Sequence, residues 1–407
     1  MILKAEIVSS VKKSQGLEIN RMLKIAFVSN YYNHHQSDFS DAMASMDDVE
    51  YYFIENSPIT SERMNMGWGF SDKPNYVLSA YQSEEIRNRC LEIINDSDLV
   101  IIGSAPDEII STRHKMHKIV FRYSERFYKK GCPKWQVPLR YAKNYMRFNR
   151  HKNDYLLCAS AFTAADAAMT KSFMGKAYKW GYFPPVKEHN LDSLFARKRA
   201  NGIVSILWVG RLIGWKHPEV SILLAEMLKS ENYHFSLNII GSGDLEESLK
   251  GLIDEKKLSD CVHLLGVKKP EEVRDYMEQS DIFLFTSDFN EGWGAVLNES
   301  MNSGCSVVAS HAIGSVPFLI RHLENGVVYH NGDFKELYEA VRLLITDKEL
   351  RENLGKAAYE TIVNEWNAKT AAERLITLYK NLVKEGNCNT FNDGPCSQAS
   401  IIKNEWF

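Results

Sequence analysis

The feature that most constrains the fold is an alternation of short apolar runs with longer amphipathic stretches along most of the chain. Several runs are apolar on both faces, as strands of a parallel sheet are when helices cover both sides. This alternation falls into two blocks and therefore predicts two doubly wound α/β domains. The runs expected as strands are 23–30, 97–105, 153–160, 204–212, 235–243, 261–267, 281–287 and 305–310.

Pro184 and Pro185 mark the border between the blocks, because each removes a backbone donor and stops a helix. A polar, charged stretch follows them, and Met22 is followed at once by the first strand pattern. The expected order is a disordered extension (1–21), a first Rossmann-like domain (22–183), a linker (184–201), a second Rossmann-like domain (202–368), a helix packing back on the first domain (369–384) and a flexible tail (385–407).

Bulk properties narrow the class of protein. The 407 residues exceed the size at which one hydrophobic core stops growing, which agrees with two domains. The net charge of −3 argues against a nucleic-acid partner. None of the seven cysteines forms a C-x-x-C pair, and no stretch approaches the roughly 18 apolar residues of a membrane span. We therefore expect a cytoplasmic protein in a reducing compartment.

Ligands of doubly wound sheets bind beyond the carboxyl ends of the strands. In the second block Arg211 and Lys216 follow "ILWVG", and Gly241, Ser242 and Gly243 follow "LNII". The run at 281–287 leads directly into "DFNEGWGAVLNE", which ends at residue 299. These strand ends are therefore the candidate site.

Glu291 and Glu299 lie eight residues apart in that last stretch. The two carboxylates of a glycosidase must flank one bond at roughly 5–9.5 Å. Eight residues of helix rise about 12 Å. The spacing is therefore poor for a hydrolytic pair and favours two ends of one long ligand.

The second block resembles the retaining, nucleotide-sugar-dependent glycosyltransferases of family 4, which have the GT-B fold. The resemblance covers about residues 203–383, and the set of motifs is more specific than any single one. The motifs are "VGRLIGWK" (209–216), "IIGSGDLEESLK" (239–250), "LLGVKKPEEV" (264–273) and "SDFNEGWGAVLNESMNSGCSVVAS" (287–310).

The resemblance implies a hexosyltransferase that moves a sugar from a UDP- or GDP-linked donor to a glycan or lipid-linked acceptor with retention of configuration. It also implies bacterial surface-polysaccharide biosynthesis as the pathway. Glu291 would contact the sugar and Glu299 the ribose, with Arg211 and Lys216 at the diphosphate. The other implied donor contacts are Gly210, Gly241, Ser242, Gly266, Val267, Gly292, Trp293, Gly294, Ala295 and Val296.

A departing diphosphate needs either a metal ion or fixed cations and backbone donors. The only close match to a metal-binding Asp-x-Asp pattern, "DSD" at 96–98, precedes a strand and so lies at the wrong end for a site. We therefore expect no metal and assign the charge to Arg211 and Lys216. Gly292 and Gly294 would let backbone N–H groups approach the phosphates at the mouth of a helix over 294–303.

Three positions depart from the family pattern: His217, where relatives often have glycine, and Ser315 and Phe318, in place of Gly and Glu near the sugar. The latter two could alter contacts with the donor. Two rival functions remain open, a nucleotide-sugar 2-epimerase of similar fold and a non-catalytic nucleotide-sugar-binding protein. The retained E-x7-E pattern with its upstream cations argues against both.

The first domain is expected to bind the acceptor. Polar residues follow its first strand and would contact acceptor hydroxyls or donor phosphate, or hydrogen-bond locally in a loop. Many members of the family place a histidine near the sugar after a later strand, and Asp107 or Glu108 could take a similar role here. The residues after the first strand are Asn33, His34, His35 and Gln36.

Residues 113–152 hold thirteen basic residues and a single acid, Glu125, with interleaved aromatics. We favour a surface that docks on anionic lipid, on the inner face of the cell membrane. A nucleic-acid patch has no accompanying motif. A solvated helix face with core aromatics is the remaining interpretation.

Overall fold

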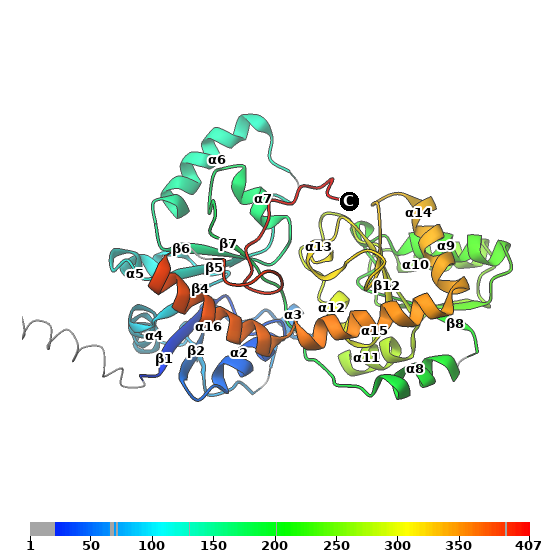
Figure 1. The fold of residues 1–407 in the computed structure, drawn as a ribbon, viewed down its shortest axis with the longest axis horizontal. Coiled ribbons are helices and arrows are strands. Elements are labelled where there is room, and N and C mark those ends of the chain that lie inside the picture. The colour runs from blue at the N-terminus through cyan, green and yellow to red at the C-terminus, as the bar shows by residue number, and fades with distance from the viewer. Residues whose placement is uncertain (1–20, 66–68, 71, 130, 201, 387–388) are drawn as a thin grey trace, which may run out of the picture. The chain divides into compact units, whose positions relative to one another are not determined.

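The computed structural model describes residues 21–65, 69–70, 72–129, 131–200, 202–386 and 389–407 (Figure 1). All but the last residue of the predicted disordered extension lies outside the described residues. The chain forms two compact units, one of residues 1–32 with 40–120 and the other of 33–39 with 121–407. This division falls within the first sheet at β5, so the predicted domain border near residue 184 stays a prediction.

The first sheet has seven strands in the order β3-β2-β1-β4-β5-β6-β7. The pairings of β1 with β2 and β4, of β2 with β3 and of β6 with β7 are parallel. The sequence predicted β1, β4 and β6 but not the others, because β3 and β7 are very short and β2 and β5 mix charged with aromatic residues. The bounds are β1 Leu23–Ser29, β2 Val49–Glu55, β3 Val77–Ser79, β4 Leu99–Ile102, β5 Val120–Ser124, β6 Asp154–Cys158 and β7 Ala177–Lys179.

The second sheet has six strands in the order β10-β9-β8-β11-β12-β13, and all five pairings are parallel. Every residue of β11 and β12 is buried, as expected for central strands covered on both faces. Only β13 was not predicted. The bounds are β8 Val204–Val209, β9 Phe235–Ile240, β10 Val262–Leu264, β11 Ile282–Phe285, β12 Ser306–Ser310 and β13 Val327–Tyr329.

Helices connect the strands, and several begin at a side-chain cap: Asp333, Asp347 and Asn367 accept hydrogen bonds from backbone N–H groups in the first turns of α14, α15 and α16. The helices before residue 184 are α2 Ser37–Ala44, α3 Ser61–Asn65, α4 Glu84–Asp96, η1 Asp107–Ile110, α5 Ser111–Lys115, η2 Lys134–Gln136, α6 Val137–Asn144, η3 Tyr145–Asn149 and α7 Thr163–Ala168. Those after it are α8 Leu191–Ala200, η4 Gly214–Lys216, α9 Pro218–Ser230, α10 Glu246–Glu255, α11 Pro270–Gln279, α12 Val296–Asn302, α13 Val316–Leu319, α14 Phe334–Thr346, α15 Lys348–Asn364 and α16 Ala368–Glu385.

The predicted linker is partly helical, and its role as the border between two domains stays a prediction. Helix α8 fills its second half and buries Leu194, Phe195 and Lys198. Lys198 Nζ donates a hydrogen bond of 3.1 Å to Met277 O at the end of α11. The charged residues around Leu194 and Phe195 concealed this apolar face in the sequence.

The C-terminal helix extends over 368–385, close to its predicted bounds, and its packing on the first domain stays a prediction. The tail after it makes specific contacts within the second unit. Gln398 forms an antiparallel bridge with Tyr178 of β7, and Cys396 is fully buried. Trp406 Nε1 donates a hydrogen bond of 2.9 Å to His311 O. The described part of the tail is therefore a packed segment and not the free end that we expected.

Candidate active site

The turn after β8 carries the two cations that the sequence predicted for a diphosphate. The Arg211 guanidinium lies 5.8 Å and Lys216 Nζ lies 4.8 Å from the ring centre of Trp215. Arg211 is exposed, whereas the Lys216 side chain is only 12% exposed. Arg211 is thus open to a ligand, and Lys216 is directed into the protein.

Lys216 and Glu291 form an ion pair, with 2.5 Å between Lys216 Nζ and Glu291 Oε2. Ser287 Oγ donates a hydrogen bond of 3.1 Å to the same carboxylate oxygen. Glu291 is about as buried as Lys216, so bulk salt screens the pair only weakly. Two of the three predicted catalytic residues therefore meet at the carboxyl ends of β8 and β11.

The glycine turn after β9 packs directly on the turn after β8. A β carbon on Gly241 would lie 1.8 Å from Gly210 O, and one on Gly243 would lie 2.4 Å from Leu212 O. Both glycines also have positive φ, so only glycine fits there. Ser242 between them is exposed.

The turn after β10 lies next to the turn after β9. Gly266 O accepts a hydrogen bond of 2.9 Å from Gly241 N, and Val267 is 72% exposed. Most of the predicted donor residues before position 290 therefore lie on adjacent turns, in the order that the sheet imposes.

The helix that joins the two glutamates is shorter than predicted. It begins at Val296, with a first hydrogen bond of 3.0 Å from Leu297 N to Gly294 O, and ends before Gly304. Gly294 has φ +83°, and a β carbon on it would lie 2.3 Å from the Phe285 ring. The turn before α12 therefore requires this glycine. Ala295 precedes the helix and, like Val296, is partly buried.

Glu299 has different surroundings from Glu291. It is partly buried in α12, and burial raises the pKa of its carboxyl, while the Arg274 guanidinium of α11 acts in the opposite direction. Glu291 is paired with Lys216 instead. The different charged neighbours agree with separate roles for the two glutamates and not with a shared bond.

The Trp293 side chain lies in the core, and the predicted contact of this residue with a donor stays a prediction. The indole is fully buried, donates a hydrogen bond of 2.9 Å to Asn298 Oδ1, and packs against Trp366 and Phe318. Phe318, which replaces a family glutamate, stacks on Trp366 at 5.9 Å. These three rings form a core cluster, so only the backbone of Trp293 is left as a ligand contact.

His217 makes contacts near its own turn that account for a histidine at this position. It adopts φ +52°, the left-handed conformation that favours glycine. Its Nδ1 lies 3.0 Å from Glu219 Oε1, and Nε2 lies 3.7 Å from Asp288 Oδ2. The hydrogen bond to Glu219 raises the pKa of His217. Contacts with two carboxylates therefore accompany the unfavourable backbone conformation.

The polar residues after β1 form a compact turn. Asn33 Oδ1 accepts a hydrogen bond of 2.9 Å from His35 N, and the rings of His34 and His35 lie 3.9 Å apart. Burial, with a smaller contribution from His34, lowers the pKa of His35 to about 3, so its ring is neutral at pH 7. Gln36 is largely buried. The Asn33 side chain thus stabilises the turn through the His35 backbone, and contact with an acceptor stays a prediction.

The remaining polar candidates give no metal centre. Asp107 begins η1 in the first unit, and its predicted role stays a prediction. In the "DSD" motif, Asp98 Oδ2 accepts a hydrogen bond of 2.9 Å from Lys24 N, a structural role at the start of β1. Among the described residues, no group of three or more His, Cys, Asp and Glu side chains is placed to hold a metal ion.

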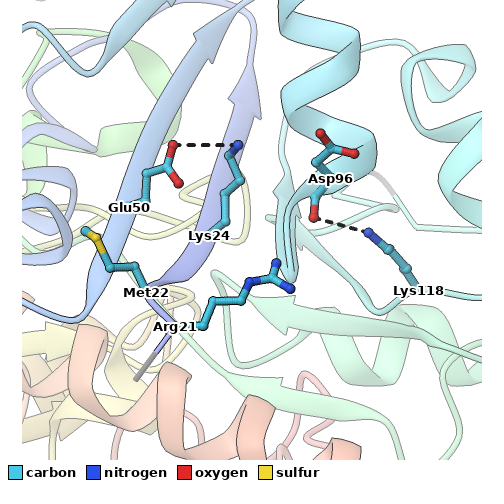
Figure 2. A pocket seen from close by; sticks show the side chains of 6 residues that line it. All are labelled: Arg21, Met22, Lys24, Glu50, Asp96 and Lys118. Atoms are coloured by element: carbon cyan, nitrogen blue, oxygen red, sulfur yellow. Dashed lines mark hydrogen bonds and ion pairs between the residues drawn. The ribbon is translucent and has the colours of Figure 1, made fainter. Parts of the chain in front are cut away.

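Figure 2 shows a pocket of about 600 Å³ in the first unit, which is a different place from the candidate site. It lies where β1 and β2 begin, the opposite end from the one that binds ligands in such sheets. Two of its lysines already have partners: Lys24 Nζ lies 3.6 Å from Glu50 Oε1, and Lys118 Nζ donates a hydrogen bond of 3.2 Å to the backbone carbonyl of Asp96. The lining residues are Arg21, Met22, Lys24, Glu50, Asp96 and Lys118.

Glu125 is the residue near the site that sequence reasoning missed. A β carbon on Gly292 would lie 2.1 Å from Glu125 Oε2 and one on Gly314 would lie 1.8 Å from Gly292 O. Gly292 is thus a close-packing glycine, whatever its backbone also binds. The signal available in the sequence was that Glu125 is the only acid in a strongly basic stretch.

The second half of the chain is similar to known glycosyltransferases. Residues 195–361 match the family Glycosyl transferases group 1. The amylovoran biosynthesis glycosyltransferase AmsK of Erwinia amylovora is 34% identical over 182 residues, which is 44% of this chain and 44% of that protein. The capsular polysaccharide biosynthesis glycosyltransferase CapM of Staphylococcus aureus is 26% identical over 191 residues, 46% of this chain and 49% of CapM. These matches span less than half of each relative.

Solved structures extend the likeness in fold to most of the chain. Anabaena HepE, crystallised in complex with UDP, has a TM-score of 0.65 at 13% identity, covering 88% of this chain and all of HepE. Sucrose-phosphate synthase of Thermosynechococcus elongatus has a TM-score of 0.58 at 17% identity, covering 89% and 99%. The two sheets and this likeness show that the fold is that of the GT-B glycosyltransferases, and residues 195–361 match a Glycosyl transferases group 1 domain.

Proposed function

We propose that the chain is a retaining hexosyltransferase that moves a sugar from a nucleoside-diphosphate donor to a glycan or lipid-linked acceptor without a metal ion. The observation that carries this proposal is the Lys216–Glu291 pair at the ends of β8 and β11. The pair places a cation and a carboxylate next to each other. A leaving phosphate requires the cation, and a sugar hydroxyl requires the carboxylate as a hydrogen-bond acceptor.

Each charged group has a role in this reaction. Arg211 and Lys216 stabilise the charge that grows on the diphosphate as the glycosidic bond breaks. Glu291 accepts hydrogen bonds from sugar hydroxyls, and Glu299 accepts them from the ribose. The departing phosphate oxygen helps take the proton of the acceptor hydroxyl, so the bond forms on the face from which the leaving group departs. Glu291, already bonded to Lys216 and Ser287, is a poor nucleophile in this arrangement.

The relatives guide the choice of donor and pathway. HepE is described with UDP and UDP-glucose, which supports a uridine donor ahead of a guanosine one. AmsK and CapM are described as enzymes of amylovoran and capsular polysaccharide biosynthesis, which supports a bacterial surface polysaccharide as the product. The epimerase and the non-catalytic binder are less well supported, because the chain retains all four charged residues of the site.

We also propose that the enzyme works as a cytoplasmic protein at the inner face of the cell membrane. No helix in the described part of the chain is long and apolar enough to cross a bilayer. The segment from Lys134 to Lys152 instead exposes large apolar side chains, with Trp135 72% and Leu139 69% exposed. Its exposed cations complement anionic lipid. They are Lys134, Lys143, Arg147, Arg150 and Lys152.

Donor screening tests the function directly. We expect a UDP-sugar to raise the melting temperature of the purified chain and to be hydrolysed slowly, at equal rates in Mg²⁺ and in EDTA. An epimerase would convert the donor sugar without releasing UDP, and a non-catalytic binder would be stabilised without turnover. Either result would contradict the proposal.

A further inference from the structure

Glu125 presents a fixed carboxylate beside the candidate sugar site, and nothing in the reaction described so far uses it. It follows β5 directly. Its Oε1 accepts a hydrogen bond of 2.6 Å from the Tyr182 hydroxyl, and its Oε2 accepts one of 2.6 Å from Lys129 Nζ. Two donors from different segments therefore set its position.

Its position is defined relative to the loop that carries Glu291. Because a β carbon on Gly292 would lie 2.1 Å from Glu125 Oε2, the carboxylate is in van der Waals contact with the residue that follows Glu291. Glycine at position 292 is what permits this approach. Both residues belong to the same compact unit.

Tyr182 is itself held firmly. Its ring stacks on His35 at 4.7 Å with 13° between the planes, and Asn298 Nδ2 donates a hydrogen bond of 3.4 Å to its carbonyl. Burial raises the pKa of Tyr182 well above its usual range, so the hydroxyl keeps its proton and can donate a hydrogen bond to Glu125. The hydrogen bond is thus preorganised.

The carboxylate still has capacity for a ligand. A carboxylate offers about four acceptor positions, and Tyr182 and Lys129 occupy two of them. The Glu125 side chain is 31% exposed. The Lys129 ammonium offsets its charge, which reduces the repulsion that an unpaired carboxylate would exert on a diphosphate nearby.

We propose that Glu125 accepts a hydrogen bond from a hydroxyl of a bound sugar and that Tyr182 is its positioning residue. This inference rests on the proposed function. The hydroxyl belongs either to the transferred sugar or to an acceptor glycan, since both present the same chemistry. In either case Glu125 selects for a hydroxyl at one position of that sugar.

The test replaces Glu125→Gln, which keeps the shape and removes the charge. A hydrogen bond to a charged group contributes about 1.5–3 kcal/mol, so kcat/KM for transfer should fall roughly 10- to 150-fold. The melting-temperature shift given by UDP alone should stay at the wild-type value, which a general structural defect would not allow. Tyr182→Phe should cause a smaller loss. Glu352→Gln, which removes a carboxylate on α15 that pairs with Arg199 of α8, is the matched control.

Two measurements separate the sources of the hydroxyl. If donor hydrolysis falls with transfer, Glu125 binds the transferred sugar. If hydrolysis is unchanged and the KM for acceptor rises, it binds the acceptor. Wild-type rates of both reactions in Glu125→Gln would overturn the inference while leaving the proposed function intact. A wild-type chain that transfers no sugar would instead contradict the proposed function.

Discussion

Two regions stand out by charge in the sequence: the turns after β8 and β11, and the basic segment 113–152. Their charged side chains have different surroundings in the folded protein. In the turns, Lys216 reaches Glu291 and forms one buried pair. In the basic segment the charges separate into two classes. Arg113 is fully buried, and Arg122 and Arg126 pair with Asp154 and Asp166, whereas the cations from 134 onward are mostly exposed.

The difference shows which sequence features predict the position of a charged side chain. A charged residue directly after a buried parallel strand is placed by the sheet itself, because all carboxyl ends of such strands lie on one edge. A run of charges in sequence has no such constraint. Arginines in it can be buried wherever carbonyl or carboxylate partners exist. The predicted docking surface therefore narrows from 113–152 to 134–152.

The largest expected effect comes from the Lys216–Glu291 pair. Lys216→Ala should lower kcat for sugar transfer about 10²- to 10³-fold, as removal of one preorganised electrostatic group typically does. Because Glu291 then loses its largely buried partner, the urea midpoint should fall as well. Steady-state kinetics and urea unfolding on one preparation measure both. Transfer at the wild-type rate would show that the cation does not act on the diphosphate.

Arg113→Met should destabilise the protein by about 3 kcal/mol or more, because buried carbonyl groups then lose their donor. The guanidinium donates hydrogen bonds of 2.6–3.1 Å to the carbonyls of Ile94, Ser97, Asp98 and Ile119. Lys115→Met on the same helix removes an exposed charge and should change stability by under about 0.5 kcal/mol. If both variants lower the free energy of unfolding in urea equally, the buried and exposed residues of the basic segment do not differ in the way proposed.

Replacing two exposed lysines, Lys134→Gln with Lys143→Gln, should weaken binding to anionic vesicles. Each lysine near such a surface contributes about 1 kcal/mol to the binding free energy. The vesicle partition coefficient of the double variant should therefore fall about 30-fold. Vesicles of phosphatidylcholine alone should bind neither protein. The matched control is Lys250→Gln with Lys348→Gln, two exposed lysines outside the segment. Absence of wild-type binding to anionic vesicles at low salt would contradict the membrane proposal.

The smallest effect concerns His217. Its pKa is raised in the folded state, so its contribution to stability is fully present below the unfolded pKa of about 6.5 and is lost as pH rises through the folded value. The side chain is about one-third exposed, so solvent reduces the effect. We expect the stability difference between wild type and His217→Gln, from urea unfolding, to shrink between pH 6 and pH 8. A difference that grows over this range would contradict the assignment.

Much of the second sheet and its site could be predicted from sequence. Five of its six strands followed from apolar runs, and Gly241 and Gly243 are required at the close approach of two turns. The first sheet was harder, because β3 and β7 have three residues each and carry no periodicity. Trp293 shows a limit of another kind, because the sequence does not say whether an aromatic side chain near a strand end faces a ligand or the core.

The sequence by itself determined most strands of the second sheet and the presence of cations and carboxylates after particular strands, because burial on both faces and strand-end position are local properties. Only the tertiary structure decided which of these groups meet. Glu125 and Gly292 are far apart in the chain, as are Lys216 and Glu291, and no local pattern encodes either contact. Such contacts arise where packing of the whole chain brings distant segments together, so side-chain partners become known only with the fold.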